Sequence, residues 1–250
     1  MDKENQYARC IVEKGETAIY QYLLQSVAAD YETVRAMKNG PRGSVSLLQN
    51  KQNGKRLVFR HYEGSGEVYQ KLLPISCPYL PQIMEAAEEN GRVAVLEEYV
   101  EGDSLAELLR GACFTATEAR EITWQLCQAL WVLHSLGAVH RDVKPENVIL
   151  RGRQAVLIDF DASRLFKGAH TADTRILGTT GYAAPEQYGI AQTDERADIY
   201  SLGVLLNIML TGKHPSKELT HGRLGHVVQK CTMVTPKKRY RSVLSLMEAL

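Results

Sequence analysis

The sequence predicts an α+β fold in which a β-rich first part is followed by a helical second part. Apolar and polar residues alternate between residues 44 and 49, and Asn53-Gly54 is a strong signal for a two-residue β-hairpin. Further along, a capping box and an apolar run of helical length indicate two long helices. With 250 residues, 44% of them hydrophobic, the chain can bury the core of one domain or of two closely packed lobes.

A short helix is predicted ahead of the strands, over residues 16–25. Its apolar side is formed by Ile19, Leu23 and Leu24. We interpret residues 1–30 as an N-terminal extension. Its helix is expected to pack on the strands that follow and to carry no chemistry.

Three antiparallel strands are expected between residues 33 and 59. The first turn, at residues 39–43, contains Gly40 and Gly43, and glycines allow a backbone to approach phosphate groups closely. A plain hairpin is the alternative interpretation of this turn. A helix of about two turns is then expected near residues 66–73, ended by Pro74. Its buried side consists of Val68, Tyr69 and Leu72.

The second half of the sequence has the signals of helices. Thr115 and Glu118 form a capping box that opens an amphipathic helix, and Gly137 closes it after Leu136. Shorter or more apolar helices are predicted over residues 103–110, 198–210 and 242–250, and strands over residues 93–96, 148–150 and 155–158.

The composition excludes several classes of protein. The net charge is +1, so neither a nucleic acid nor another polyanion is expected as a partner. The five cysteines have no metal-ligand spacing, which indicates reduced thiols and a cytoplasmic protein. No apolar stretch is long enough for a signal peptide or a membrane span, and the helical pattern at the last residues leaves room for an anchor beyond residue 250.

One motif organises the chemistry of the chain, the octapeptide at residues 140–147. Asp142 can accept a proton from an attacking hydroxyl group, and Lys144 can neutralise charge on a moving phosphoryl group. Asn147 and Asp159 offer the hard oxygen ligands that Mg²⁺ prefers. This combination predicts phosphoryl transfer. The alternative is a polar loop between two buried elements.

These motifs resemble those of eukaryotic-type (Hanks-type) Ser/Thr protein kinase domains, of the kind also found in bacteria. Lys144, two residues after Asp142, is typical of the Ser/Thr-directed branch. The resemblance covers roughly residues 31–250. It implies a two-lobed fold with a small β-rich lobe and a larger helical lobe. The expected boundaries are 31–97 for the small lobe, 98–102 for the hinge and 103–250 for the large lobe.

The resemblance also implies the ligands and the site residues. ATP and Mg²⁺, or Mn²⁺, are the expected cofactors, and a protein with an acceptor serine or threonine is the expected substrate. The expected catalytic residues are Asp142, Lys144, Asn147 and Thr179, with Asn147 and Asp159 as metal ligands. The expected nucleotide-binding residues are Gly40, Gly43, Val45, Val58, Arg60, Glu97, Glu98, Val100 and Ile149.

Residues 159–186 resemble a kinase activation segment that ends in Ala-Pro-Glu. Thr171 and Thr174 lie where an activating phosphate could sit, with Arg141 as its partner, although both could be plain loop residues. The remaining expected contacts are structural. They are an Asp198 cap on the catalytic-loop backbone, a structural role for His134, and a buried ion pair between Glu186 and Arg239.

Three positions depart from the family pattern, two in the small lobe and one in the large lobe, and leave more than one function open. Lys38 replaces a glycine, Arg60 replaces the phosphate-binding lysine, and Asp161 replaces the glycine after Asp-Phe. These changes favour a pseudokinase, a binding or scaffold module with little transfer. The complete catalytic loop favours the enzyme. A small-molecule phosphotransferase is a third possibility, against which the activation segment argues.

The shortened helix leaves the usual glutamate partner of Arg60 in doubt, because Glu67 falls one residue early. Glu97, at the gatekeeper position, lies on the strand expected beside that of Arg60. A buried arginine and a buried carboxylate are each costly alone and tolerable together. We therefore predict that Glu97 lies within about 4 Å of Arg60 and replaces the helix glutamate. In the alternative, Glu97 faces solvent and Arg60 pairs with Glu63 or Glu67.

Overall fold

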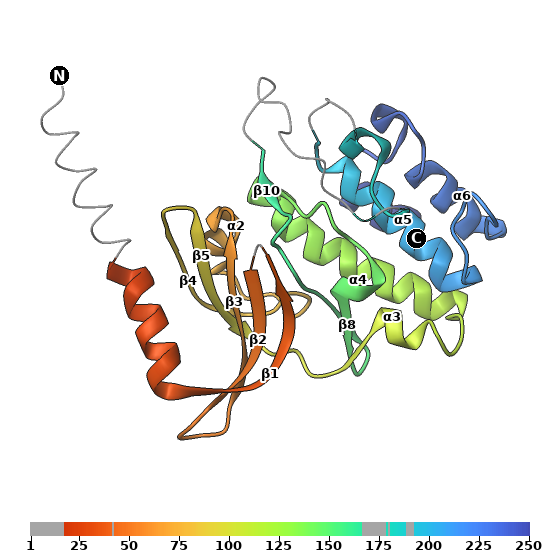
Figure 1. The fold of residues 1–250 in the computed structure, drawn as a ribbon. Coiled ribbons are helices and arrows are strands. Elements are labelled where there is room, and N and C mark those ends of the chain that lie inside the picture. Colours follow the sequence, from red (N-terminus) through yellow and green to blue (C-terminus); the bar gives the residue numbers. More distant parts are fainter. Residues whose placement is uncertain (1–17, 42, 167–178, 180, 189–192) are drawn as a thin grey trace, which may run out of the picture. The chain divides into compact units, whose positions relative to one another are not determined.

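The computed structural model describes residues 18–41, 43–166, 179, 181–188 and 193–250. Figure 1 shows the fold of the chain, coloured by residue number. Its contacts divide into two units. The first unit comprises the described residues up to 76 together with 81–99, and the second comprises 77–80 and 100–250. Residues 77–80, predicted in the first lobe, therefore pack with the second unit. There the Leu157 N–H donates to Tyr79 O at 2.9 Å.

The first unit is an antiparallel sheet of five strands in the order β1-β2-β3-β5-β4. Its strands are β1 (Tyr31–Gly40), β2 (Gly43–Asn50), β3 (Arg56–Glu63), β4 (Ile83–Glu89) and β5 (Arg92–Glu98). The three predicted strands are confirmed, and a hairpin turn includes Asn53-Gly54, with Gly54 at φ 71°. The predicted two-residue loop is wrong, because β2 ends at Asn50, β3 begins at Arg56, and the Asn50 N–H donates to Lys55 O at 2.9 Å across a longer loop.

A helix over residues 18–30 precedes the sheet and packs on one of its faces. It continues five residues beyond the predicted end at residue 25. Tyr20 and Leu23 are buried, whereas Ile19 is 51% exposed, so the prediction that Ile19 lies on the packed side is wrong. Leu23 lies on the packed side as predicted, Tyr20 takes the place predicted for Ile19, and Leu24 and Val27 are partly buried beside them.

The helix α2 (Glu67–Leu72) has only six residues, which confirms the predicted shortening. Val68, Tyr69 and Leu72 are buried, as the apolar pattern predicts. After the helix, the Ile75 N–H donates to Leu72 O, so the chain leaves α2 in a turn. Pro74 lies in this turn and has no N–H group with which to continue the helix.

The second unit is mainly helical. Its helices are α3 (Leu105–Leu108), α4 (Ala116–Ser135), α5 (Arg196–Thr211), α6 (Gly222–Cys231) and α7 (Val243–Ala249), with 3₁₀ turns η1 (Pro145–Asn147), η2 (Pro185–Tyr188) and η3 (Pro236–Lys238). Its short strands are β6 (Asp103–Ser104), β7 (Ala138–Val139), β8 (Val148–Arg151), β9 (Gln154–Leu157) and β10 (Arg164–Leu165).

The helix termini explain where α4 and α3 begin. Thr115 and Glu118 form the predicted capping box of α4, with the Glu118 N–H donating to Thr115 Oγ1 at 3.3 Å. The helix predicted over residues 103–110 is shorter, because residues 103–104 pair with β8 and Ser104 caps α3 instead. Helices α4 and α5 are the helices that contribute most residues to the core of this unit. Its fully buried members include Leu126, Leu130, Leu133, Leu202, Leu205, Leu206 and Met209.

Residues 212–221 join α5 to α6 without a helix between them. Among the helices that the structure describes, none combines the length and apolar character needed to cross a membrane.

Candidate active site

A closed network of hydrogen bonds surrounds the Asp142 carboxylate. Oδ1 accepts from Thr179 Oγ1 at 2.8 Å, and Oδ2 accepts from Asn147 Nδ2 at 3.0 Å. Lys144 Nζ lies 2.7 Å from Asp142 Oδ2 and 2.8 Å from Thr179 Oγ1. The four residues predicted as catalytic are thus assembled in one place. The contacts fix the orientation of a carboxylate whose side chain remains partly exposed, at 16%.

The backbone under this network is held by Asp198 at the start of α5. Its carboxylate accepts from the N–H groups of His140 and Arg141 at 2.9 and 2.8 Å, which confirms the predicted cap. Burial alone raises the pKa of Asp198. The hydrogen bond from His134, at 2.9 Å, and the two N–H groups outweigh burial and hold that pKa below its usual value. His134 therefore has the structural role expected of it.

His140 is buried beneath the loop as a neutral ring. Burial lowers its pKa, although nearby carboxylates act in the opposite direction. Its Nδ1 accepts from the Asp142 N–H at 3.3 Å, so its proton lies on Nε2, 3.3 Å from Ile158 O. The edge of Phe160 packs against the ring with centroids 5.5 Å apart. These contacts connect the Asp-Phe-Asp segment to the catalytic loop.

Two residues of this region adopt a left-handed backbone that non-glycine residues rarely use. Arg141 and Asp159 both have φ 70°. Such conformations cluster at functional sites, where neighbouring contacts hold them. Asp161, which replaces the family glycine, is not among the residues with positive φ. An aspartate therefore fits at this position without backbone strain.

The residues expected to hold a cation are Asn147 and Asp159. Because Asn147 Nδ2 donates to Asp142 O at 2.9 Å and to Asp142 Oδ2, the amide oxygen is the atom that can face a cation. Asp159 Oδ1 accepts weakly from the Asp161 N–H at 3.3 Å. Elsewhere in the described ranges, no three His, Cys, Asp or Glu side chains gather into a metal-binding cluster. The oxygen donors that are present fit Mg²⁺.

The predicted glycine-rich turn joins β1 to β2, with Gly40 paired to Gly43. Gly43 has φ 153°, and a Cβ there would lie 2.5 Å from His61 O and from Tyr62 Cβ. The neighbouring strand β3 therefore already requires glycine at this position. By contrast, Gly40 has space for a side chain, so the sheet alone does not explain that glycine.

Arg60 on β3 and Glu97 on β5 form a buried ion pair, with Nε 2.6 Å from Oε1. The residues are 4% and 2% exposed. The prediction that Glu97 lies within about 4 Å of Arg60 is confirmed, and the alternative of a solvent-facing Glu97 is wrong.

The other residues expected around a nucleotide are divided between the two units, and each is described within its own unit. Val45 and Val58 are buried in the first unit, and Val100 is buried in the second. Ile149 is half-buried on β8. The Glu98 N–H donates to Gln82 O at 2.8 Å, and the Glu98 carboxylate accepts from the Gln82 N–H at 3.1 Å, so the end of β5 is fixed to the preceding segment.

The end of the activation segment is tied to the loop after α6. Arg239 donates to both carboxylate oxygens of Glu186, at 2.6 and 2.8 Å, and its side chain is fully buried. The predicted ion pair is confirmed. Thr171 and Thr174, the predicted phosphorylation sites, lie outside the described residues.

Sequence reasoning missed one buried polar residue of this segment, Gln187. Its Nε2 donates to Arg141 O at 2.9 Å, and its Oε1 accepts from the Ala184 N–H. A glutamine directly after Ala-Pro-Glu gives no periodic signal, so only the folded contacts identify it.

Comparisons with known proteins agree with this geometry. The family model of the protein kinase domain matches residues 31–247. The chain is 30% identical over 204 residues to the serine/threonine-protein kinase pkn2 of Myxococcus xanthus, covering 74% of this chain and 25% of that protein. It is 30% identical over 263 residues to the serine/threonine-protein kinase PknA of Nostoc sp., covering 88% and 46%. It is 35% identical over 208 residues to the probable serine/threonine-protein kinase pknA2 of Bifidobacterium longum, covering 76% and 28%. The chain spans less than half of the length of each of these relatives.

Proposed function

Because the chain belongs to the protein kinase family, we propose that it transfers the terminal phosphoryl group of ATP to serine or threonine residues of a protein substrate. The observation that carries this proposal is the closed network of Asp142, Lys144, Asn147 and Thr179. The kinase relatives support the same chemistry. Protein kinases generally use ATP and Mg²⁺, and both are the cofactors proposed for this chain.

In the proposed reaction, the acceptor hydroxyl oxygen forms a bond to the γ-phosphorus while the bond to the bridging oxygen breaks and ADP leaves. The proton of the hydroxyl group passes to the Asp142 carboxylate, which the Thr179 and Asn147 contacts hold in one orientation. Lys144 neutralises charge on the transferred group. Positioning and charge stabilisation supply most of the acceleration in this type of reaction.

The remaining groups would hold the nucleotide and its cation. Mg²⁺, when bound by the oxygens of Asn147 and Asp159, supplies positive charge to the phosphates. Arg60 would contact the phosphates in place of lysine, in an orientation that Glu97 fixes. The turn at Gly40 and Gly43 would lie against the same phosphates.

The choice of serine and threonine acceptors rests on Lys144 and Thr179. The threonine accepts from the lysine and donates to Asp142, so the three side chains form one unit at the acceptor position. Replacement of the usual residues by Lys38, Arg60 and Asp161 favours a binding-only module instead. The intact Asp142 network favours the enzyme, because a scaffold has no need of it.

The decisive experiment compares wild type with Asp142→Asn for phosphate transfer from ATP to a mixture of Ser- and Thr-containing peptides, with Mg²⁺ or Mn²⁺. We expect transfer to fall by a factor of about 10² to 10⁴, the usual contribution of a general base, while ATP binding by calorimetry is retained. Asp103→Asn, at an exposed carboxylate, is the matched control. If wild type binds ATP but transfers no phosphate with either metal, the binding-only function is correct. Equal transfer by wild type and Asp142→Asn would exclude Asp142 as the base.

A further inference from the structure

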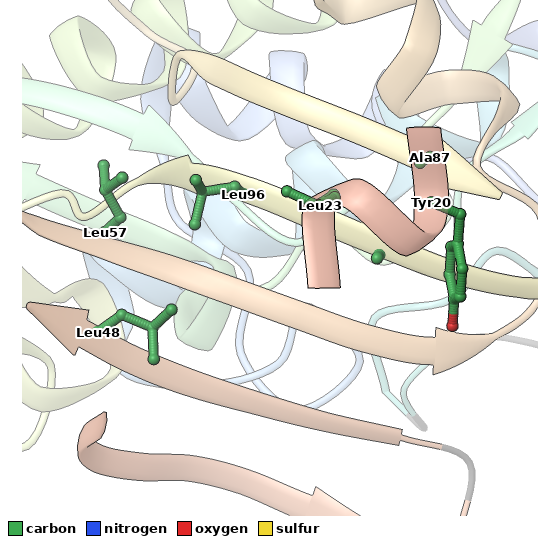
Figure 2. Close-up of a cluster of buried hydrophobic side chains, with 7 residues drawn as sticks. Tyr20, Leu23, Leu48, Leu57, Ala87 and Leu96 are labelled. Atoms are coloured by element: carbon green, nitrogen blue, oxygen red, sulfur yellow. The ribbon is translucent and has the colours of Figure 1, made fainter. Parts of the chain in front are cut away.

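The helix over residues 18–30 precedes the segment that matches the kinase family, yet it completes the core on one face of the sheet. Figure 2 shows its side chains over the strands. The buried cluster consists of Tyr20, Leu23, Leu48, Leu57, Ala87, Ala94 and Leu96. Five of these residues come from four strands, so without the helix a continuous apolar surface of the sheet would face solvent.

Two of these four strands, β3 and β5, carry the Arg60–Glu97 pair on the face of the sheet opposite the helix. On β3, Leu57 belongs to the cluster under the helix, and side chains alternate along a strand, so Arg60 points the other way. On β5, Leu96 lies under the helix, and Glu97 next to it also points away. The helix and the ion pair therefore act on opposite faces of one pair of strands.

Polar contacts fix the helix in one position. Tyr20 Oη and His61 Nε2 are hydrogen bonded at 2.7 Å, which ties the helix to β3 one residue after Arg60. Gln21 Nε2 donates to Glu89 Oε2 on β4 at 2.6 Å. At the other end, Lys51 Nζ donates to the carbonyl groups of Ala28 and Ala29 at 3.2 and 2.7 Å. These contacts satisfy carbonyl groups that a helix end leaves without partners.

We propose that Tyr20 is a positioning residue for the nucleotide site, because it fixes β3 through His61 and so holds Arg60 in register with Glu97. This inference rests on the proposed function, in which Arg60 contacts the phosphates. The ion pair joins adjacent strands, in which Val58 lies opposite Glu97 and Arg60 opposite Val95. A short contact of 2.6 Å between two strands is sensitive to their twist and separation. In the family, the helix at the position of α2 supplies the glutamate that pairs with the phosphate-binding lysine. Here α2 has only six residues.

The test uses Tyr20→Phe in the full chain, which removes the hydroxyl group and keeps the buried ring. We expect the Kd for ATP and the KM for ATP to rise by about 3- to 10-fold, the equivalent of one lost hydrogen bond, while the KM for the acceptor peptide is unchanged. Tyr22→Phe is the matched control, because Tyr22 is on the same helix and 70% exposed.

A double-mutant cycle separates positioning from general stability. If Tyr20 acts through the ion pair, Tyr20→Phe has no further effect on the Kd for ATP once Glu97→Gln is present. Additive effects on the Kd, or a lower Tm with an unchanged Kd, would overturn the proposal.

Failure of the Tyr20 proposal can be told apart from failure of the proposed function. If wild type binds ATP without transferring phosphate, the proposed function fails, and the Kd comparison still tests the role of Tyr20. If wild type binds no ATP, amide hydrogen exchange over residues 57–61 and 94–98 decides. Faster exchange in Tyr20→Phe than in Tyr22→Phe supports the proposal, and equal exchange overturns it.

Discussion

Arg60 and Glu97 form an ion pair inside the sheet of the first unit, where Nε lies 2.6 Å from Oε1 and both side chains are almost fully buried. Taking two charges out of water is expensive, and only close contact between them offsets that cost. The Glu97 carboxylate can therefore be buried at the gatekeeper position because Arg60, which replaces the family lysine, offsets the cost of burying its charge. Glu97 does the same for the charge of Arg60. Arginine also suits a directed contact with a carboxylate better than lysine does.

The first prediction separates the contribution of this ion pair to the stability of the protein from its role in nucleotide binding. Arg60→Met leaves the Glu97 charge buried without this cation, so we expect the free energy of unfolding to fall by roughly 3–5 kcal/mol. The double variant Arg60→Met, Glu97→Met should recover most of that loss, because apolar residues of similar volume often replace a buried pair at no net cost. Denaturant unfolding measures both changes.

Nucleotide binding should be lost in both variants, since each lacks the guanidinium group. Lys55→Met, at an exposed position in the preceding turn, controls for the loss of one positive charge. Calorimetric binding of ATP by the stable double variant at the wild-type Kd would show that Arg60 has no role in the nucleotide site.

The second prediction concerns Arg239. Its guanidinium bonds Glu186 and also the carbonyl groups of Met233, Val234 and Arg196, at 2.8 to 3.1 Å. Arg239→Ala removes all of these contacts, so we expect a loss of roughly 3–5 kcal/mol in the free energy of unfolding. Arg241→Ala, at an exposed neighbour, should change it by less than about 0.5 kcal/mol. Similar unfolding midpoints for the two variants would contradict the importance of the pair.

The third prediction concerns the cation. Because the proposed Mg²⁺ ligands are Asn147 and Asp159, ATP should stabilise the protein more in Mg²⁺ than in excess chelator. At 100 times the Kd, a nucleotide adds about 2.7 kcal/mol of stability, which a thermal shift readily detects. Asp159→Asn should reduce the difference between the two conditions, and Asp103→Asn should not. Identical shifts with Mg²⁺ and with chelator would count against a metal-dependent nucleotide site.

Much of this fold and site could be predicted because the signals are local. The capping box at Thr115 and the hairpin at Asn53-Gly54 specify structure within a few residues. The catalytic loop could be identified because Asp142, Lys144 and Asn147 have a fixed spacing within eight residues. The Arg60–Glu97 pair followed from strand order together with the cost of burying a single charge.

The errors came where tertiary packing decides the outcome. The helix over residues 18–30 has apolar residues on more than one side, and the sheet selects Tyr20 over Ile19. Its length depends on Lys51, which bonds its last carbonyl groups from a distant hairpin. Similarly, residues 77–80 join the second unit through a backbone bond to Leu157 that no sequence pattern announces.

The last prediction concerns the pH dependence of stability. Burial lowers the pKa of His140 in the folded state from the value near 6.5 that the unfolded chain has. A proton on Nδ1 would also meet the Asp142 N–H, which now donates to that atom. Below about pH 6.5 the unfolded state binds more protons at this residue, so the free energy of unfolding decreases as the pH falls, by up to about 1.4 kcal/mol per pH unit until the folded pKa is reached.

His140→Phe keeps an aromatic ring and cannot titrate, so its unfolding free energy should decline less than that of wild type between about pH 6.5 and 5. His226→Phe, at an exposed histidine on α6, is the matched control for replacing a histidine by phenylalanine. Chemical denaturation at a series of pH values measures the three curves, and parallel curves for wild type and His140→Phe would show that His140 titrates equally in both states.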